Sequence, residues 1–78
     1  MMIKLYRFMH CPYCDLVQDY MDEHEIAYTI VLVQRENKPK EVTSTGGTVP
    51  VIEVHGKLIS DSARIIAYLK NTPREELA

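Results

Sequence analysis

The chain has 78 residues, of which 46% are hydrophobic and 26% are charged, and its formal net charge is −2. This length allows one domain with one modest core, and the composition is that of a globular protein rather than a disordered one. Because 11 acidic and 9 basic residues are spread along the chain and no apolar run is long enough to span a bilayer, we expect neither nucleic acid nor a membrane as a partner.

A first strand is predicted at residues 2–8, which are apolar apart from Lys4 and Arg7. A nearly continuous apolar run is typical of a strand that is buried on both faces, so we expect this strand at the centre of its sheet. The first residues have neither the length nor the small-residue cleavage site of a signal peptide. We therefore expect one domain over residues 1–78, located in the cytoplasm.

The only two cysteines, Cys11 and Cys14, lie at the start of a predicted helix. Pro12 fits the first helical position, where no N–H is needed. Apolar residues then recur at helical spacing on one face: Leu16, Val17, Tyr20 and Met21. Free N–H groups at a helix N-terminus stabilise a thiolate, so we expect Cys11 to be the nucleophile. Cys14, one turn later and less exposed, is expected to be the resolving thiol.

Other uses of a cysteine pair fit this sequence less well. A structural zinc site needs about four ligands, and the histidines at positions 10, 24 and 55 are not placed to complete one. Attachment of a c-type haem requires histidine directly after the second cysteine, where this chain has Asp15. A disulfide that closes so short a loop restrains little of the unfolded chain. Redox chemistry without a bound metal is the remaining interpretation.

The second half of the chain predicts one more strand, a short helix, a hairpin and a final helix. Residues 27–33 form a strand rich in β-branched residues, joined to the first strand in a parallel, right-handed βαβ unit. A helix of at most two turns is expected at residues 39–44, ended by two glycines. Residues 48–54 and 57–60 predict a hairpin that reverses at His55 and Gly56.

The final helix shows an apolar stripe at Ile65, Ile66 and Leu69, with Ser60 or Asp61 as its N-cap. The remaining residues 71–78 are expected to form a polar tail. The predicted order βαβαββα is an α/β fold, and a C-x-x-C pair beside a βαβ unit is the thioredoxin-like redox motif.

Three motifs in order, CPYC at 11–14, TVP at 48–50 and DS at 61–62, resemble those of a dithiol glutaredoxin. KLY before HCPYC, and SDSARIIAYL in the last helix, are similar in particular to glutaredoxins that share the N-terminal domain of glutathione transferases. The resemblance implies a thioredoxin fold, in which three helices flank a four-stranded mixed sheet, and glutathione as co-substrate. The chain departs from the commonest pattern at Phe8, where many glutaredoxins have a basic residue, and at Ile59 and Ser60, which replace a double glycine.

The resemblance also implies which residues contact glutathione. Val49 precedes the family's cis-proline, Pro50, and would pair with the cysteinyl backbone as an added strand does. An acid and a serine at the start of the last helix would hold the γ-glutamyl group, and Arg35 or Lys38 would hold the glycyl carboxylate. The full set is Tyr13, Arg35, Lys38, Thr48, Val49, Pro50, Asp61 and Ser62.

We therefore expect a monomeric, glutathione-dependent oxidoreductase that reduces protein disulfides and glutathionylated proteins and so takes part in electron transport and cell redox homeostasis. One alternative is a thioredoxin-like reductant supplied by a flavoprotein reductase. A second is a protein that uses Cys11 and glutathione to hold an iron-sulfur cluster across a dimer. Pro12 argues mildly against this alternative, because it stiffens the cleft. A third is a glutathione sensor without turnover. A transferase reaction is less expected, because the helical second domain of a transferase is not in this sequence.

Overall fold

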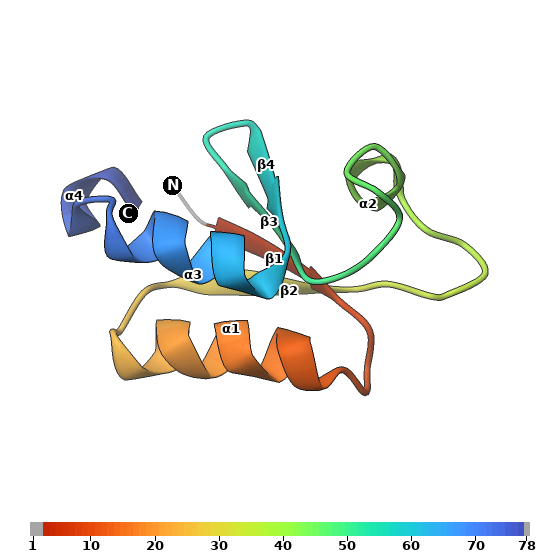
Figure 1. Ribbon diagram of the computed structural model, residues 1–78, viewed down its shortest axis with the longest axis horizontal. Coiled ribbons are helices and arrows are strands. Elements are labelled where there is room, and N and C mark those ends of the chain that lie inside the picture. The colour runs from red at the N-terminus through yellow and green to blue at the C-terminus, as the bar shows by residue number, and fades with distance from the viewer. Residues whose placement is uncertain (1–2, 78) are drawn as a thin grey trace.

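A four-stranded mixed sheet forms the centre of the protein, and helices lie on both of its faces (Figure 1). The computed structural model describes residues 3–77. The strands are β1 (Ile3–Arg7), β2 (Tyr28–Leu32), β3 (Val51–Val54) and β4 (Lys57–Ser60). They lie in the order β2-β1-β3-β4, with β2 parallel to β1, β3 antiparallel to β1, and β4 antiparallel to β3. The predicted central position of the first strand is confirmed, although Met2 lies outside the described residues.

Four helices connect and cover the strands: α1 (Pro12–Glu23), α2 (Lys40–Thr43), α3 (Ser62–Lys70) and α4 (Arg74–Leu77). α1 links the two parallel strands and packs beside α3. Both helices begin toward the end of the molecule at which β1 leads into the Cys11 loop, on the right in Figure 1. After α2 come Gly46 and Gly47, whose φ values of +112° and +80° are rarely adopted by residues with a side chain.

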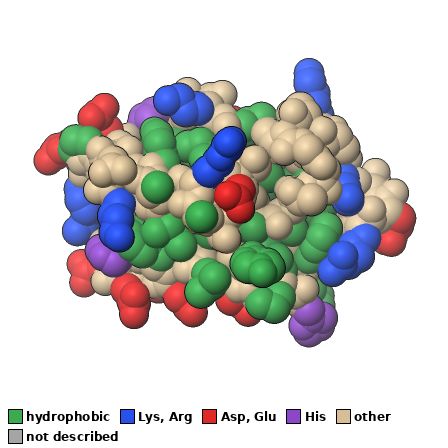
Figure 2. Space-filling view, in the orientation of Figure 1, with side chains coloured by type: hydrophobic (Ala, Val, Ile, Leu, Met, Phe, Trp, Pro, Cys, Tyr) green, Lys and Arg blue, Asp and Glu red, His purple; other side chains and the backbone are tan. Residues whose placement is uncertain are grey.

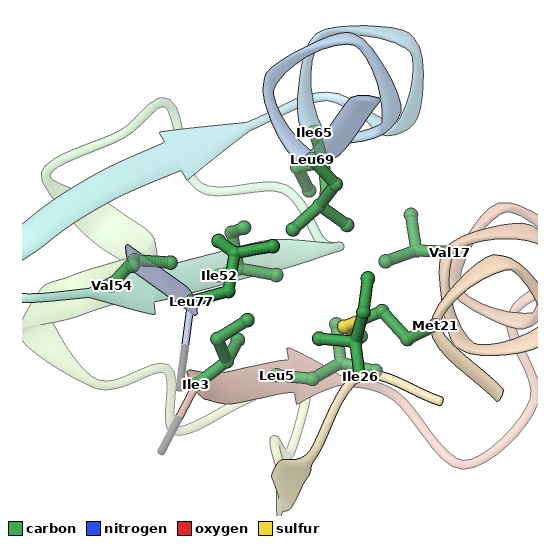
Figure 3. Packing of buried hydrophobic residues seen from close by; sticks show 10 residues of the cluster. All are labelled: Ile3, Leu5, Val17, Met21, Ile26, Ile52, Val54, Ile65, Leu69 and Leu77. Carbon is green, nitrogen blue, oxygen red and sulfur yellow. The ribbon is translucent and has the colours of Figure 1, made fainter. Parts of the chain in front are cut away.

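Alternation along the strands divides the apolar side chains between the two faces of the sheet. The larger cluster lies between the sheet, α1 and α3 and includes Leu77 of α4; Figure 3 shows its members, Ile3, Leu5, Val17, Met21, Ile26, Ile52, Val54, Ile65, Leu69 and Leu77. The smaller cluster, around α2, consists of Tyr6, Val33, Val42 and Val51. Lys4 alternates onto the α2 side and is exposed, because a four-residue helix covers only part of that face.

The buried stripe of α1 differs from the predicted one. Cys14, Val17 and Met21 are the buried residues of this helix, whereas Leu16 is 54% exposed. Consecutive residues of an α-helix are rotated by about 100°, so Leu16 points well away from the direction of Val17. Leu16, which the sequence placed on the apolar face of this helix, is therefore not part of the core, and the buried position in the first turn belongs to Cys14.

The C-terminal residues do more than form the expected polar tail. Leu77 of α4 is 4% exposed and belongs to the larger core cluster. The His55 ring hydrogen bonds through Nε2 to the Glu76 carbonyl at 2.5 Å, and Arg74 donates to the Glu25 carbonyl at 3.2 Å. The sequence did not predict this helix because one large apolar residue in eight produces no periodic pattern.

The hydroxyl groups of two tyrosines form hydrogen bonds between different elements, β2 with α1 and β1 with β3. Their pKa values predict a loss of stability at high pH. Tyr28 donates to Asp22 at 2.6 Å and Tyr6 to Glu53 at 3.2 Å. Burial, together with nearby carboxylates, raises the pKa of each phenol from 10.0 to about 12. The folded state therefore binds these protons more tightly than the unfolded state does. This contribution to stability is complete below pH 10.0 and is lost as the pH rises through about 12.

The free energy of unfolding should show this decline when it is measured by urea unfolding at several pH values from pH 8 to pH 12. This range includes the ordinary tyrosine pKa of about 10. Tyr28→Phe should make the decline shallower, because one of the two linked groups is removed. Tyr13→Phe is the matched control, since the Tyr13 side chain is 65% exposed, and it should follow the wild type. A Tyr28→Phe curve parallel to the wild-type curve would contradict the assignment.

Candidate active site

Cys11 lies at the point where β1 ends and α1 begins. It is the N-cap of α1 with an extended backbone (φ −154°, ψ 101°), and Pro12 follows at the first helical position. The Cys11 sulfur accepts a hydrogen bond from the backbone N–H of Cys14 at 3.2 Å. A helix N-terminus presents such free N–H groups and the positive end of the helix dipole. Both would stabilise negative charge on this sulfur when the protein is reduced.

Cys11 and Cys14 form a disulfide, with their Cα atoms 5.2 Å apart. The side chain of Cys14 is fully buried beneath the helix, whereas Cys11 is partly exposed. Only Cys11 is therefore accessible to an incoming sulfur compound. This geometry fits the roles expected from the sequence, in which Cys11 attacks and Cys14 resolves.

A pocket of about 340 Å³ opens beside Cys11. Five of the predicted site residues line it: Cys11, Arg35, Lys38, Thr48 and Val49. It also takes in four residues that were not predicted for the site: Phe8, His10, Pro12 and Gly47. The β1 end, the start of α1, the segment after β2 and the segment before β3 thus meet at one opening. Segments separated by more than 30 residues come together there only because β1 lies between β2 and β3.

The charged side chains at this pocket are basic. Arg35 lies with its guanidinium carbon 4.2 Å from the centre of the Phe8 ring, and Lys38 donates to the Gly47 carbonyl at 2.7 Å. A cation over an aromatic ring is held by the ring's quadrupole. No acidic residue is among the described residues that line the pocket. The pocket is therefore suited to a ligand that carries a carboxylate.

Phe8 follows β1 directly and is in contact with one of the two basic side chains of the pocket. The Phe8 ring supports Arg35, which comes from the segment that follows the neighbouring strand β2. The sequence predicted Arg35 as one of two candidate carboxylate partners but gave no sign of its contact with Phe8.

The peptide bond between Val49 and Pro50 is cis, as the resemblance implied. Pro50 is buried directly before β3, so its missing N–H costs no hydrogen bond within the strand. Val49 and Thr48 face the pocket, while Pro50 is not among the residues that line it. Of the TVP motif, then, Thr48 and Val49 line the pocket, and Pro50 contributes the cis peptide bond that follows them.

Asp61 and Ser62 stand at the start of α3, outside the lining of the Cys11 pocket. Asp61 is the N-cap, but its carboxylate makes no capping hydrogen bond. Its φ of +73° with ψ of +123° lies outside the regions that non-glycine residues favour. Strain of this kind persists only where the surrounding structure enforces it, and it is concentrated at functional sites. Asp61 is exposed to solvent.

Tyr13 lies apart from these residues, whereas His10 lines the pocket with them. Tyr13 follows Pro12 on α1 but is 65% exposed and does not line the pocket. His10 lines the Cys11 pocket and also an adjoining hollow of about 320 Å³, which shares Phe8 and Arg35. His10 is therefore a residue of the site, next to the nucleophile, and not only a solvent-facing side chain.

Within residues 3–77, no set of three or more His, Cys, Asp and Glu side chains is arranged to hold a metal ion. The helices described for the same residues are too short or too polar to cross a membrane.

Comparison with known proteins identifies the family. The family described as "Glutathione S-transferase, N-terminal domain" matches residues 5–76. Prostaglandin E synthase 2 of Danio rerio is 35% identical over 69 residues, which are 87% of this chain and 18% of that protein. TDR1 of Leishmania, a trimeric glutathione transferase of known structure, is 32% identical with a TM-score of 0.79, over 92% of this chain and 17% of that one.

The fold is also that of glutaredoxin 2 of Salmonella typhimurium, solved in complex with glutathione. That structure has a TM-score of 0.77 and 24% identity over 88% of this chain and 33% of its own. This chain thus spans no more than a third of any of these proteins: 17% of TDR1, 33% of glutaredoxin 2 and 18% of prostaglandin E synthase 2. The matches confirm the expected thioredoxin-like fold, and this chain belongs to the family of glutathione S-transferase N-terminal domains.

Proposed function

We propose that this protein is a dithiol glutaredoxin, which uses glutathione to reduce protein disulfides and glutathionylated proteins through Cys11 and Cys14. The observation that carries the proposal is the Cys11–Cys14 disulfide at the edge of a basic pocket. A second thiol beside the nucleophile supports disulfide exchange, because it can attack a mixed disulfide that forms at Cys11. We also propose that the protein acts as a monomer in the cytoplasm, where glutathione keeps thiols reduced.

The proposed reaction on a glutathionylated protein has two exchanges. The Cys11 thiolate attacks the glutathione sulfur, a Cys11–glutathione disulfide forms, and the substrate leaves as a thiolate. A second glutathione thiolate then attacks the bound glutathione sulfur, which releases oxidised glutathione and restores the Cys11 thiolate. In this cycle one free glutathione is consumed: it leaves joined to the glutathione that the substrate carried, and the substrate is left as a thiol.

On a protein disulfide, the Cys11 thiolate forms a mixed disulfide with one substrate sulfur. Cys14 then loses its proton and attacks the Cys11 sulfur, which gives the Cys11–Cys14 disulfide seen in the structure and a substrate dithiol. Two glutathiones reduce the enzyme disulfide and leave as oxidised glutathione.

Glutathione would lie with its sulfur at Cys11 and its glycyl carboxylate toward Arg35 and Lys38, the two cations of the pocket. The backbone of Val49 would pair with the cysteinyl residue, and the γ-glutamyl group would extend to Asp61 and Ser62 at the start of α3. Support for this orientation comes from charge: the basic side chains line the pocket, and an acid that makes no capping bond stands at α3.

The test is the reduction of a glutathionylated peptide by the purified protein in the presence of glutathione, NADPH and glutathione reductase. Turnover that depends on glutathione is the expected result. Turnover that needs only a flavoprotein thioredoxin reductase would contradict the proposal and favour a thioredoxin-like reductant. An absence of turnover with either system, despite measurable glutathione binding, would favour a sensor.

Replacing Lys38 should weaken the use of glutathione. A charge-assisted hydrogen bond is worth about 1.5–3 kcal/mol, so Lys38→Ala should raise KM for glutathione by roughly ten- to a hundredfold, with a smaller effect on kcat. Lys40→Ala is the matched control, because Lys40 is exposed on α2 and lies outside the pocket lining. An unchanged KM in the Lys38 variant would mean that this side chain does not hold the carboxylate.

A further inference from the structure

Arg7, the last residue of β1, is a buried cation beside the active site. Its side chain is 9% exposed and points to the α1 side of the sheet, in step with Leu5. Its Nε donates to the Phe8 carbonyl at 2.9 Å and its Nη2 to the Met9 carbonyl at 3.3 Å. These two carbonyls belong to the loop that leads to Cys11. Arg7 therefore fixes the approach of the chain to the nucleophile.

The same guanidinium also holds the first turns of α1. It contacts the Gln18 amide oxygen at 2.6 Å and forms an ion pair with Asp15 at 2.7 Å. Burying a charge is costly unless it is paired and hydrogen bonded, and all three guanidinium nitrogens of Arg7 have acceptors. The cysteine loop and helix α1 are thus joined through one side chain.

Asp15 lies one helical turn after Cys11, since its backbone N–H donates to the Cys11 carbonyl at 2.9 Å. A carboxylate about one helical turn from Cys11 disfavours a thiolate there by Coulomb repulsion. The Arg7 guanidinium, bound to the same carboxylate, offsets that repulsion. The other charged or titratable side chains around Cys11 are His10 in the preceding loop and Arg35 and Lys38 in the pocket.

We propose that the Arg7–Asp15 ion pair sets the proton affinity of the Cys11 thiol, and that Arg7 is a positioning residue which keeps Asp15 from suppressing the thiolate. The two charges act on Cys11 with opposite sign, so the loss of either one would shift the titration of the thiol. The inference rests on the proposed function only in taking Cys11 as the attacking thiol.

The test is a titration of thiolate absorbance at 240 nm in the reduced Cys14→Ser protein, in which Cys11 is the single thiol. Asp15→Asn leaves Arg7 unbalanced and should move the titration midpoint to lower pH. Arg7→Met leaves Asp15 unbalanced and should move the midpoint to higher pH. A unit charge about one helical turn away corresponds to a shift of about 0.5–1 pH units in each direction. The double variant should return to within about 0.3 of the starting midpoint.

Two further variants separate charge from packing. Arg7→Lys keeps the positive charge but loses the planar fork, and it should stay nearer to the Arg7 midpoint than Arg7→Met does. Asp19→Asn removes an exposed acid one turn further along α1 and is the matched control, with an expected shift below about 0.2 pH units. A merely structural role for Arg7 would give shifts of the same sign in Arg7→Met and Asp15→Asn, and that result would overturn the proposal.

The proposal stays testable if Arg7→Met fails to fold. Asp15 has a side chain that is 60% exposed, so Asp15→Asn is expected to fold and its midpoint alone decides the sign. An unmoved midpoint in a folded Asp15→Asn protein would overturn the inference. The titration uses no glutathione, so shifted midpoints in a protein without glutathione-dependent turnover would support this inference while rejecting the proposed function.

Discussion

Replacing Cys11 by serine should abolish glutathione-dependent reduction, with a loss of roughly a thousandfold or more, because a serine hydroxyl does not ionise near neutral pH as a thiol at a helix N-terminus does. Serine is close to cysteine in size and is a favoured N-cap residue, so α1 should form as before. The measurement is turnover on a glutathionylated peptide and on a protein disulfide. Activity on both substrates should be lost.

Cys14→Ser is the matched variant, since it removes the other sulfur of the same disulfide. It should retain activity on the glutathionylated peptide, because a second glutathione completes that reaction without Cys14. It should lose activity on protein disulfides, which need the resolving thiol. Turnover that survives in Cys11→Ser would show that Cys11 is not the nucleophile, and equal losses in both variants would contradict the division of roles.

Leu77→Ala should destabilise the domain by about 2–5 kcal/mol, the usual cost of removing a fully buried leucine from a core. Leu77 is 4% exposed and packs with the larger core cluster between the sheet, α1 and α3. A domain of this size has a free energy of unfolding of roughly 4–12 kcal/mol. The substitution should therefore produce a large fall in the urea midpoint, or leave the protein partly unfolded at 37 °C.

Glu76→Ala is the control for this prediction. Its side chain is exposed, and the contact with His55 is made by its backbone carbonyl, which the substitution keeps. The free energy of unfolding should change by less than about 0.5 kcal/mol. If Leu77→Ala changed the free energy of unfolding as little as Glu76→Ala, α4 would not contribute to the core, which would then end at α3.

The sequence was sufficient for the main elements because their patterns are local. The nearly unbroken apolar run before Phe8, the β-branched run after Ala27 and the KLIS strand (Lys57–Ser60) each produce a signal within a few residues. Leu16 shows the limit of that approach. A helix wheel identifies an apolar face, but the width of the buried stripe depends on how closely the sheet and α3 approach the helix.

The candidate site also combines residues that neighbouring sequence predicts with residues that only the tertiary structure brings together. Cys11 and Cys14 are three residues apart, so their place at a helix start could be predicted from the CPYC sequence and Pro12 alone. Arg35 and Lys38 were predicted only as two basic residues after a strand. That they share a pocket with Cys11 depends on β1 lying beside β2 and on the segment before β3 closing the far wall.

By itself, then, the sequence determined the order of strands and helices as far as α3, the α/β class and the place of the two cysteines at a helix start, because hydrophobic period and helix capping are encoded by neighbouring residues. Only the tertiary structure decided that Arg7 is buried against Asp15, that Phe8 supports Arg35 and that Leu77 completes the core. Each of these contacts joins residues from different elements. Their energies come from burial and charge pairing, which exist only after the sheet has brought those elements together.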